Sequence, residues 1–232
     1  MAVEEVVASP VCRIYRGKLR GKPCLLVQTG MGRERAEKAT QFVLDRFPVT
    51  ALISLGFAGA LTPDLKIGDV VVCSTVHRTS GLEKDEGEVE AYSADASLLA
   101  HASSGPKDGS TRFSLGTSVM VPRVVSSPQR KQELGHEFHA QIVDMESYWI
   151  ARMASNQRVP LIAIRSISDT LQHGLQPLDH ILAPDGRLLG KRVVPYFLLH
   201  PQYLVRVFTP LRNMRPAERN LTAFISDLVT RV

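Results

Sequence analysis

Short apolar runs alternate along this chain with segments in which apolar residues recur every three or four positions. Continuous apolar runs are typical of strands covered on both faces, and the wider spacing is typical of amphipathic helices. Segment 33–47 shows the helical spacing, with Ala36, Ala39, Phe42 and Val43 on one side. The alternation of the two patterns predicts an α/β protein.

The same pattern gives the expected order of elements. We expect strands at 11–15, 23–29, 51–55, 69–76, 112–121, 141–143 and 161–165. We expect helices at 33–47 and 145–156, a hairpin turn within 17–21, an exposed acidic loop at 82–90 and a mostly helical chain end. Since no repeat or linker-like stretch divides the sequence, we predict one domain over residues 1–232, with a basic helical segment at 187–232.

The composition is that of an ordinary globular protein, with 44% hydrophobic and 22% charged residues among 232. It excludes intrinsic disorder, a collagen-like fibre and a disulfide-stapled miniprotein. The apolar stretches fall short of the ~20 residues that a membrane-spanning helix requires, and residues 1–10 lack the basic region of a signal peptide. Cys12, Cys24 and Cys73 are scattered without CxxC spacing, which indicates reduced thiols, a cytoplasmic protein and no metal site.

The end of the chain accounts for the whole of the net charge of +5, because residues 187–232 hold eight basic and two acidic residues. Basic segments bind nucleic acid or anionic membranes in some proteins. Here the charges are spaced along an apolar-rich segment and are not blocked together. We therefore favour a solvated helix face and expect no nucleic acid partner.

Four expected strands are followed by turns that could carry chemistry. Two of these turns are rich in glycine, and two are acidic: Gly30–Gly32, Gly56–Ala60, Asp144–Ser147 and Ser168–Asp169. In open α/β sheets, ligands bind beyond the carboxyl ends of the strands. The sequence therefore predicts that these turns converge on one edge, although the glycine turns alone are equally consistent with strand ends that bind nothing.

The acidic turns have a structural and a chemical interpretation. Asp144 and Asp169 are each consistent with a simple helix cap, and Glu146 is consistent with a carboxylate favoured by a helix N-terminus. Taken together, they suit cleavage of a glycosidic bond. In that chemistry one protonated carboxyl assists the leaving group, while another carboxylate holds the sugar hydroxyls.

Three stretches of the sequence resemble a known superfamily. They are Gly17–Cys73, the VDMESYWIARMA of Val143–Ala154 and the VPLIAIRSISDT of Val159–Thr170. They resemble the 5′-methylthioadenosine/S-adenosylhomocysteine nucleosidases and the purine nucleoside phosphorylases. The LAPDGR of Leu182–Arg187 and the segment Leu198–Arg212 are similar to the hopanoid-associated phosphorylase branch. The resemblance implies a three-layer α/β/α sandwich around a central mixed, twisted β-sheet, with the first strand of the family missing.

The resemblance also implies roles for individual residues. Glu146 would accept hydrogen bonds from the ribose hydroxyls, and Asp169, oriented by Ser168, would protonate the purine at N7. Met145 would pack against the sugar, or else be a core methionine. The reaction needs no metal and no organic cofactor. Further residues implied to line the substrate site are Gly30, Arg33, Gly56, Phe57, Ala58, Val119, Met120 and Val121.

The sequence departs from the family at two places. The family carries a glutamate near the ribose at the end of its first loop, and Glu5 or Glu4 is the candidate here, against an acidic N-terminus with no such role. Ser54 and Phe57 stand where phosphorylases of the family have an arginine and a serine for phosphate. Their loss favours water as the nucleophile, while Arg33 or Arg123 leaves phosphorolysis open.

Segment 193–208 has two interpretations. Its apolar bulk with basic flanks is typical of an interfacial membrane helix or of a mouth for a lipid-linked nucleoside. We favour packing on the core or on a second subunit over peripheral membrane contact, because Pro195, Pro201 and Pro210 divide the segment into short helices.

The resemblance and the residues together predict an enzyme, an N-ribosyl hydrolase that releases adenine from a 5′-substituted adenosine. One alternative is a pentosyltransferase, a nucleoside phosphorylase that uses phosphate, with an adenosyl-hopanoid-type lipid as a candidate substrate. Another is a catalytically weak nucleoside-binding protein. The expected partners are a small purine nucleoside, phosphate in the alternative, and further copies of the chain in a homodimer or higher homo-oligomer.

Overall fold

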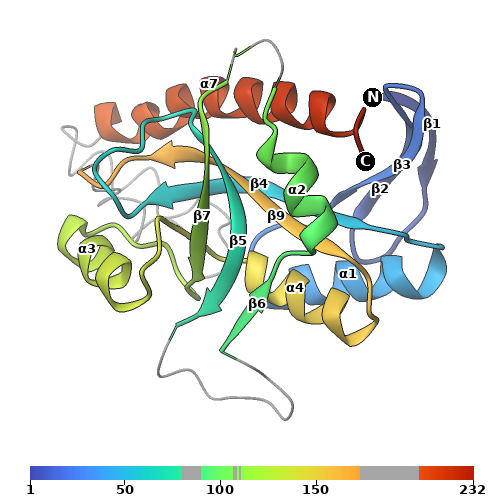
Figure 1. The fold of residues 1–232 in the computed structure, drawn as a ribbon, viewed down its shortest axis with the longest axis horizontal. Coiled ribbons are helices and arrows are strands. Elements are labelled where there is room, and N and C mark those ends of the chain that lie inside the picture. Colours follow the sequence, from blue (N-terminus) through green and yellow to red (C-terminus); the bar gives the residue numbers. More distant parts are fainter. Residues whose placement is uncertain (80–89, 107–108, 110, 173–203) are drawn as a thin grey trace.

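The computed structural model describes residues 1–79, 90–106, 109, 111–172 and 204–232, with side chains from 214 onward in the last range (Figure 1). The strands are β1 Ala2–Val7, β2 Arg13–Leu19, β3 Lys22–Gln28, β4 Leu52–Ala60, β5 Val70–Arg78, β6 Ala91–Ser93, β7 Phe113–Met120, β8 Ile142–Asp144 and β9 Leu161–Asp169. The helices are α1 Arg33–Arg46, α2 Ala96–Ser103, α3 Pro128–Glu137, α4 Ser147–Asn156 and α7 Leu204–Leu228. The order confirms the predicted α/β class.

A six-stranded mixed sheet forms the centre, in the order β6-β5-β7-β8-β4-β9. β5, β7 and β8 run parallel, as do β4 and β9, while β4 is antiparallel to β8. An additional antiparallel pairing joins β5 to β9 and closes five of the strands into a ring. The mixed central sheet predicted from the resemblance is therefore confirmed.

Helices cover both faces of this sheet. On one face, Val71 of β5 belongs to the same buried cluster as Trp149 of α4. On the other face, Val72 is buried in a cluster with Leu98 of α2 and Phe224 of α7. Figure 1 shows α7 along one side of the sheet and α1 with α4 along the other. Strands buried on both faces explain why the apolar runs are continuous, and the three layers are as expected.

Two strands are longer than predicted. β4 continues through Gly56–Ala60, and β9 continues through Ser168 to Asp169. The prediction of a second glycine turn is therefore wrong, because Phe57 pairs with Ser166 and Ala58 with Ile167 in the parallel ladder between β4 and β9. Glycine and serine suggest a chain reversal in the sequence, but here they allow side chains of neighbouring strands to approach the backbone closely.

The first strand differs from the expectation of a loop end. Ala2–Val7 forms β1, which pairs antiparallel with β2 in a separate three-stranded sheet, β1-β2-β3. Within the described residues, the edge of β4 opposite β9 is paired only at Gly59 and Ala60, which meet β8. The central sheet therefore has an open edge beside residues 52–58.

The C-terminal helix corrects one prediction and agrees with another. α7 continues through Pro210, so this proline does not end a short helix as expected. Arg215 and Arg219 are exposed while Phe224 and Leu228 are buried, which is the solvated basic face that we favoured. Within the described part of the chain, no helix has both the length and the apolar character needed to cross a membrane.

Several predictions fall on residues outside the described ranges. The acidic loop at 82–90 does so except for Glu90, as do LAPDGR at 182–187 and most of segment 193–208. The sequence pattern also missed β6, α2 and α3, which are described. The last of these proves important for the site.

Candidate active site

The first glycine turn contacts the first acidic turn directly. The backbone N–H of Gly32 donates a hydrogen bond of 2.8 Å to Oε1 of Glu146. Gly32 has a φ of 88°, in the left-handed region that glycine adopts without strain, and it immediately precedes α1. The structure thus brings together two segments that are separated by more than a hundred residues.

Asp144 holds the backbone on which Glu146 is placed. Its Oδ1 accepts hydrogen bonds from the backbone N–H groups of Glu146 at 3.0 Å and Ser147 at 2.9 Å. Its Oδ2 accepts from the hydroxyls of Ser118 and Ser147 and forms an ion pair with Nε of Arg165 at 3.3 Å. Asp144 is therefore the cap of α4, and Glu146 makes no capping hydrogen bond of its own.

Burial raises the pKa of Glu146 above its ordinary value. The hydrogen bond from Gly32 opposes this shift because it favours the ionised carboxylate. A carboxylate at the start of a helix, with one oxygen already held by a backbone N–H, is oriented and ready to accept further donors. This is the chemistry that recognition of vicinal sugar hydroxyls requires.

Asp169 lies at the end of β9, between a hydroxyl and an ammonium group. Ser168 donates its hydroxyl to Oδ1 of Asp169 at 3.0 Å and also contacts the carbonyl of Ala58 at 3.3 Å. Oδ2 forms an ion pair with Nζ of Lys131, which comes from α3. Both the lysine and the aspartate are buried, at 0% and 7% exposure.

Lys131 is the residue of this site that sequence reasoning missed. Its helix contains few apolar residues, so no amphipathic pattern predicts α3. A weaker signal is present: Ser127 caps the helix by accepting the backbone N–H of Arg130, and Pro128 stands in the first turn. This is the residue pattern of a helix start.

Gly59 of β4 lies between the two acidic strand ends. It pairs with Val143 of β8 on one side and with Asp169 of β9 on the other. A Cβ at Gly59 would lie 2.9 Å from Oδ2 of Asp169, so the glycine allows the carboxyl to approach the strand. The predicted meeting of parallel carboxyl ends is corrected in one respect: β8 runs antiparallel to β4, and Val143 near the end of β8 pairs with Gly59 near the end of β4.

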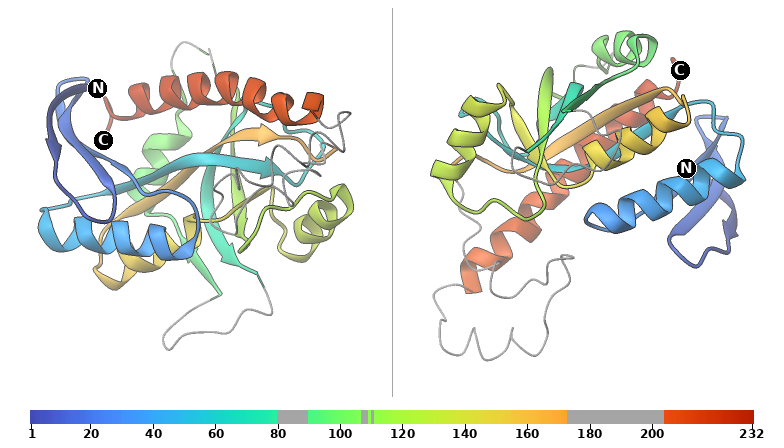
Figure 2. Two further views of the ribbon diagram at one scale, coloured as in Figure 1. Left: turned by 180° about the vertical axis from the view of Figure 1, so that it is seen from behind. Right: turned by 90° about the horizontal axis from the view of Figure 1, so that it is seen from below.

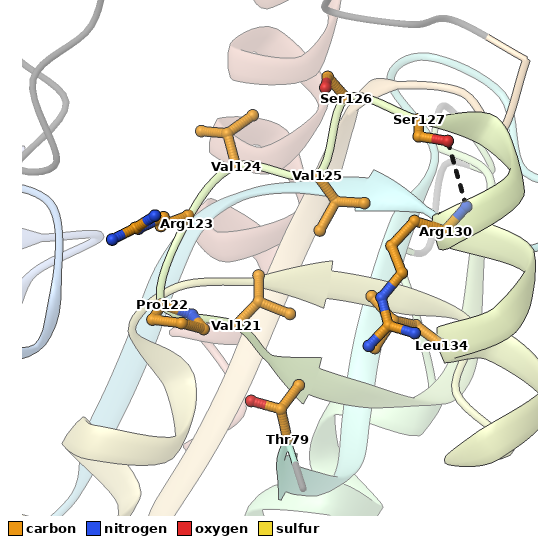
Figure 3. A pocket seen from close by; sticks show the side chains of 10 residues that line it. All are labelled: Thr79, Val121, Pro122, Arg123, Val124, Val125, Ser126, Ser127, Arg130 and Leu134. Carbon is orange, nitrogen blue, oxygen red and sulfur yellow. Dashed lines mark hydrogen bonds between the residues drawn. The ribbon is translucent and has the colours of Figure 1, made fainter. Parts of the chain in front are cut away.

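Residues 119–121, expected to line the base pocket, are buried. Val119 and Val121 join an apolar cluster against which Met145 packs, while Met120 faces the cluster of α4. A cavity of about 400 Å³ opens beside them, and Val121 lines it, whereas neither Glu146 nor Asp169 does. Figure 3 shows Arg130 and the apolar side chains around the cavity, with Arg123 directed away from them. Its lining residues are Thr79, Val121, Pro122, Arg123, Val124, Val125, Ser126, Ser127, Arg130 and Leu134.

The first glycine turn and Arg33 have local partners. Gly30 has a φ of 84°, and the side chain of Arg35 lies against it. The guanidinium of Arg33 stacks on the ring of Trp149, 4.0 Å from its centroid, and Nε donates to Glu37 at 3.2 Å. Arg33 is therefore already engaged by a carboxylate and an aromatic ring.

Of the two expected phosphate positions of β4, Ser54 contacts the buried Arg165. The hydroxyl of Ser54 accepts a hydrogen bond of 3.0 Å from Nη2 of Arg165. A Cβ at Gly56 would lie 3.5 Å from Nε of the same arginine. Phe57, the other expected phosphate position, is half-buried on β4 between Gly56 and Ala58. Arg165 thus makes these contacts in the interior of the protein.

Glu5 lies away from Asp169. It is an exposed residue of β1, and its carboxylate forms an ion pair with Arg16 at 3.2 Å. Figures 1 and 2 show the β1–β3 sheet at one end of the molecule and α3, which supplies Lys131, at the other. The structure therefore does not bring Glu5 next to Asp169.

The three thiols are free. Cys12 and Cys24 are half-buried, and Cys73 is buried in β5. Burial raises the pKa of Cys73 to about 12, so its thiol stays protonated. Among the residues that the structure describes, no three His, Cys, Asp or Glu side chains gather as a metal site.

The closed mixed sheet, covered by helices on both faces and carrying acids at the ends of β8 and β9 on either side of β4, defines a nucleoside phosphorylase-like fold. The family model of the Phosphorylase superfamily matches residues 2–185, and the chain belongs to this family. Its relatives include 5′-methylthioadenosine/S-adenosylhomocysteine nucleosidases. That of Tolumonas auensis is 28% identical over 71% of this chain and 76% of its own length. That of Baumannia cicadellinicola is 30% identical over 68% and 73%.

A solved structure shares the fold across almost the whole chain. The nucleosidase of the same name from Neisseria meningitidis, in complex with methylthio-immucillin-A, superimposes with a TM-score of 0.77. It covers 99% of this chain and 91% of its own, at 20% sequence identity. At this identity the likeness concerns the fold.

Proposed function

We propose that this chain hydrolyses the N-glycosidic bond of a 5′-substituted adenosine and releases adenine. The observation that carries the proposal is the position of Gly59, with Val143 paired on one side and Asp169 on the other. Glu146 follows Val143 by three residues, so the segment that carries it leaves β8 beside Gly59, while Asp169 pairs with Gly59 on the other side. The names of the relatives, which are methylthioadenosine and S-adenosylhomocysteine nucleosidases, supply the substrate class.

In this mechanism the two acids act on different parts of the nucleoside. Glu146 accepts hydrogen bonds from the ribose hydroxyls and holds the sugar while positive charge develops at C1′. Met145 packs on the sugar, and Val119–Val121 line the base. Asp169 delivers a proton to N7, the C1′–N9 bond breaks, and its electron pair leaves with the neutral base. Water adds to C1′ and loses a proton.

The partners of the candidate anion ligands favour water over phosphate as the nucleophile. Arg33 is held by Trp149 and Glu37, and the hydroxyl of Ser54 is held by Arg165. Phosphate is a doubly charged ligand, and binding it without charged or hydrogen-bonding partners is unfavourable. A homodimer and an adenosyl-hopanoid-type substrate are implied by resemblance alone and stay predictions.

The test is release of adenine from 5′-methylthioadenosine and S-adenosylhomocysteine, measured by chromatography with and without phosphate. We expect the same rate in both conditions and a free 5′-substituted ribose as the second product. A requirement for phosphate, with ribose 1-phosphate as product, would establish the phosphorylase instead. Calorimetric binding of the nucleoside without turnover would establish a binding protein.

A further inference from the structure

A lysine with no exposed surface lies against the acid that the proposed reaction uses. Lys131 pairs with Oδ2 of Asp169, and its ammonium also donates a hydrogen bond of 2.9 Å to the carbonyl of Thr170. Lysine is almost never fully buried in proteins unless its charge is compensated. The two contacts fix Nζ at the end of β9, directly on the carboxyl group expected to meet the base.

Asp169 accepts a hydrogen bond on each of its two carboxyl oxygens. One oxygen accepts from the hydroxyl of Ser168 and the other from the ammonium of Lys131. This is the arrangement of an ionised carboxylate, which accepts on both oxygens. An ionised carboxylate has no proton to give to N7, and the nearest transferable proton is on Lys131.

We propose that Lys131 is a positioning residue that holds the proton for Asp169 and passes it on during cleavage. As the C1′–N9 bond breaks, Asp169 gives a proton to N7 and Lys131 gives one to Asp169. Lys131 is then a neutral amine, and it regains its proton from the water that adds to C1′. The balance is one nucleoside and one water giving one 5′-substituted ribose and one adenine. The inference rests on the proposed function, since it names the source of that reaction's proton.

A lysine at this position can supply a proton as well as a positive charge. An arginine in the same place would neutralise Asp169 equally well, but a guanidinium does not give up its proton in proteins. An ammonium group exchanges its proton readily when it is buried beside an acceptor. Substitution by arginine therefore separates the supply of a proton from the neutralisation of a charge.

The experiment compares two leaving groups in the same enzyme. One substrate is 5′-methylthioadenosine, whose base leaves only when N7 is protonated. The other is a nitrophenyl riboside with the same 5′ group, whose phenolate leaves without a proton. We expect Lys131→Met to lower kcat for the nucleoside by about 100-fold or more, the range of general acid catalysis, with KM within a few-fold. The rate on the nitrophenyl riboside should stay within about 3-fold, because it needs no acid.

Lys131→Arg should show the same split between the two substrates. A matched control is Lys38→Met, which removes an exposed lysine paired with Glu34 at 2.6 Å on α1 and should leave both rates unchanged. Thermal unfolding of each variant is recorded alongside. Retained activity on the nitrophenyl riboside is an internal check that the site is assembled.

Three results would overturn the inference. An equal loss on both substrates would make Lys131 a purely structural partner of Asp169, and no loss on either would remove it from the reaction. Full nucleoside activity in Lys131→Arg would reduce its role to charge. Failure of the unsubstituted protein to release adenine is a different outcome, because it overturns the proposed function and the inference falls with it.

Discussion

The ends of β8 and β9 each carry a buried aspartate beside a basic residue, yet the two pairs differ in what they can do. The carboxylate oxygens of Asp144 accept hydrogen bonds from two backbone N–H groups and two serine hydroxyls, and one of them pairs with the guanidinium of Arg165. Asp169 accepts from Ser168 and from the ammonium of Lys131. Arginine holds its proton permanently, whereas lysine can release it.

The comparison separates a carboxylate that builds the scaffold from one that can carry chemistry. The donors around Asp144 are backbone N–H groups, serine hydroxyls and a guanidinium that does not give up its proton, so its contacts fix the start of α4 and orient Glu146. The donors around Asp169 are the hydroxyl of Ser168, at the end of β9, and the ammonium of Lys131, from α3. Burial and charge alone would not distinguish the two acids; the identity of their partners does.

The largest effect is expected on stability, from Asp144→Ala. Removal of the carboxylate leaves the guanidinium of Arg165 buried and without its ion pair, and such losses cost about 3–5 kcal/mol. Urea unfolding should show this decrease in the free energy of unfolding. Asp64→Ala, on the exposed loop after β4, is the control and should change it little. A loss for Asp144→Ala as small as that of the control would contradict the scaffold role.

Asp169→Asn is expected to act on catalysis instead. The amide cannot deliver a proton to N7, so kcat should fall by about 100-fold or more while the fold is kept. Steady-state release of adenine gives the rate, and the urea transition gives the stability. Activity within a few-fold of the unsubstituted protein would remove Asp169 from its proposed role.

Glu146→Gln should chiefly damage recognition of the sugar. The ionised carboxylate is the form that accepts both hydroxyls, and hydrogen bonds to charged groups contribute about 1.5–3 kcal/mol, so KM should rise by about 10-fold or more. Because burial raises the pKa of Glu146, affinity for the nucleoside should fall as the pH drops through that raised value. This occurs at a higher pH than for an exposed glutamate.

The control for this prediction is the pH profile of the variant. Glutamine does not titrate, so Glu146→Gln should lack the acidic limb in 1/KM. Linkage gives a second check: the folded state holds the proton of Glu146 more tightly than the unfolded chain does. The free energy of unfolding contributed by this group should therefore decline as the pH rises from the unfolded to the raised folded pKa. Unaltered kinetics would leave Glu146 with a role only at the helix start.

The periodicity of the sequence predicted the sheet and the helices that cover it, because continuous apolar runs reflect burial on both faces. It failed where side chains are small or polar for local reasons. Gly56–Ala60 suggested a turn, but these residues form strand, and Gly59 stands where a Cβ would lie 2.9 Å from Oδ2 of Asp169. α3 was not predicted because Leu134 is its only buried hydrophobic residue.

The sequence predicted the candidate residues of the site, but not which residues pair with one another. Glu146 and Asp169 could be selected because acids follow apolar strands. Asp144 forms an ion pair with Arg165, and Asp169 with Lys131. These pairs depend on which strands and helices become neighbours in the fold. Ion pairs between segments tens of residues apart leave no local pattern in the sequence.

The smallest effect is expected from Glu5→Ala, which tests whether the N-terminal sheet takes part in the reaction. Glu5 is exposed and paired with Arg16, and exposed ion pairs contribute at most about 1 kcal/mol. We expect kcat and KM within about 2-fold of the unsubstituted protein and an unfolding free energy lower by about 1 kcal/mol or less. Glu4→Ala, which removes an exposed ion pair between Glu4 of β1 and Lys18 of β2, is the matched control. A selective loss of kcat in Glu5→Ala alone would bring β1 into the active site and make Glu5 the base that activates water.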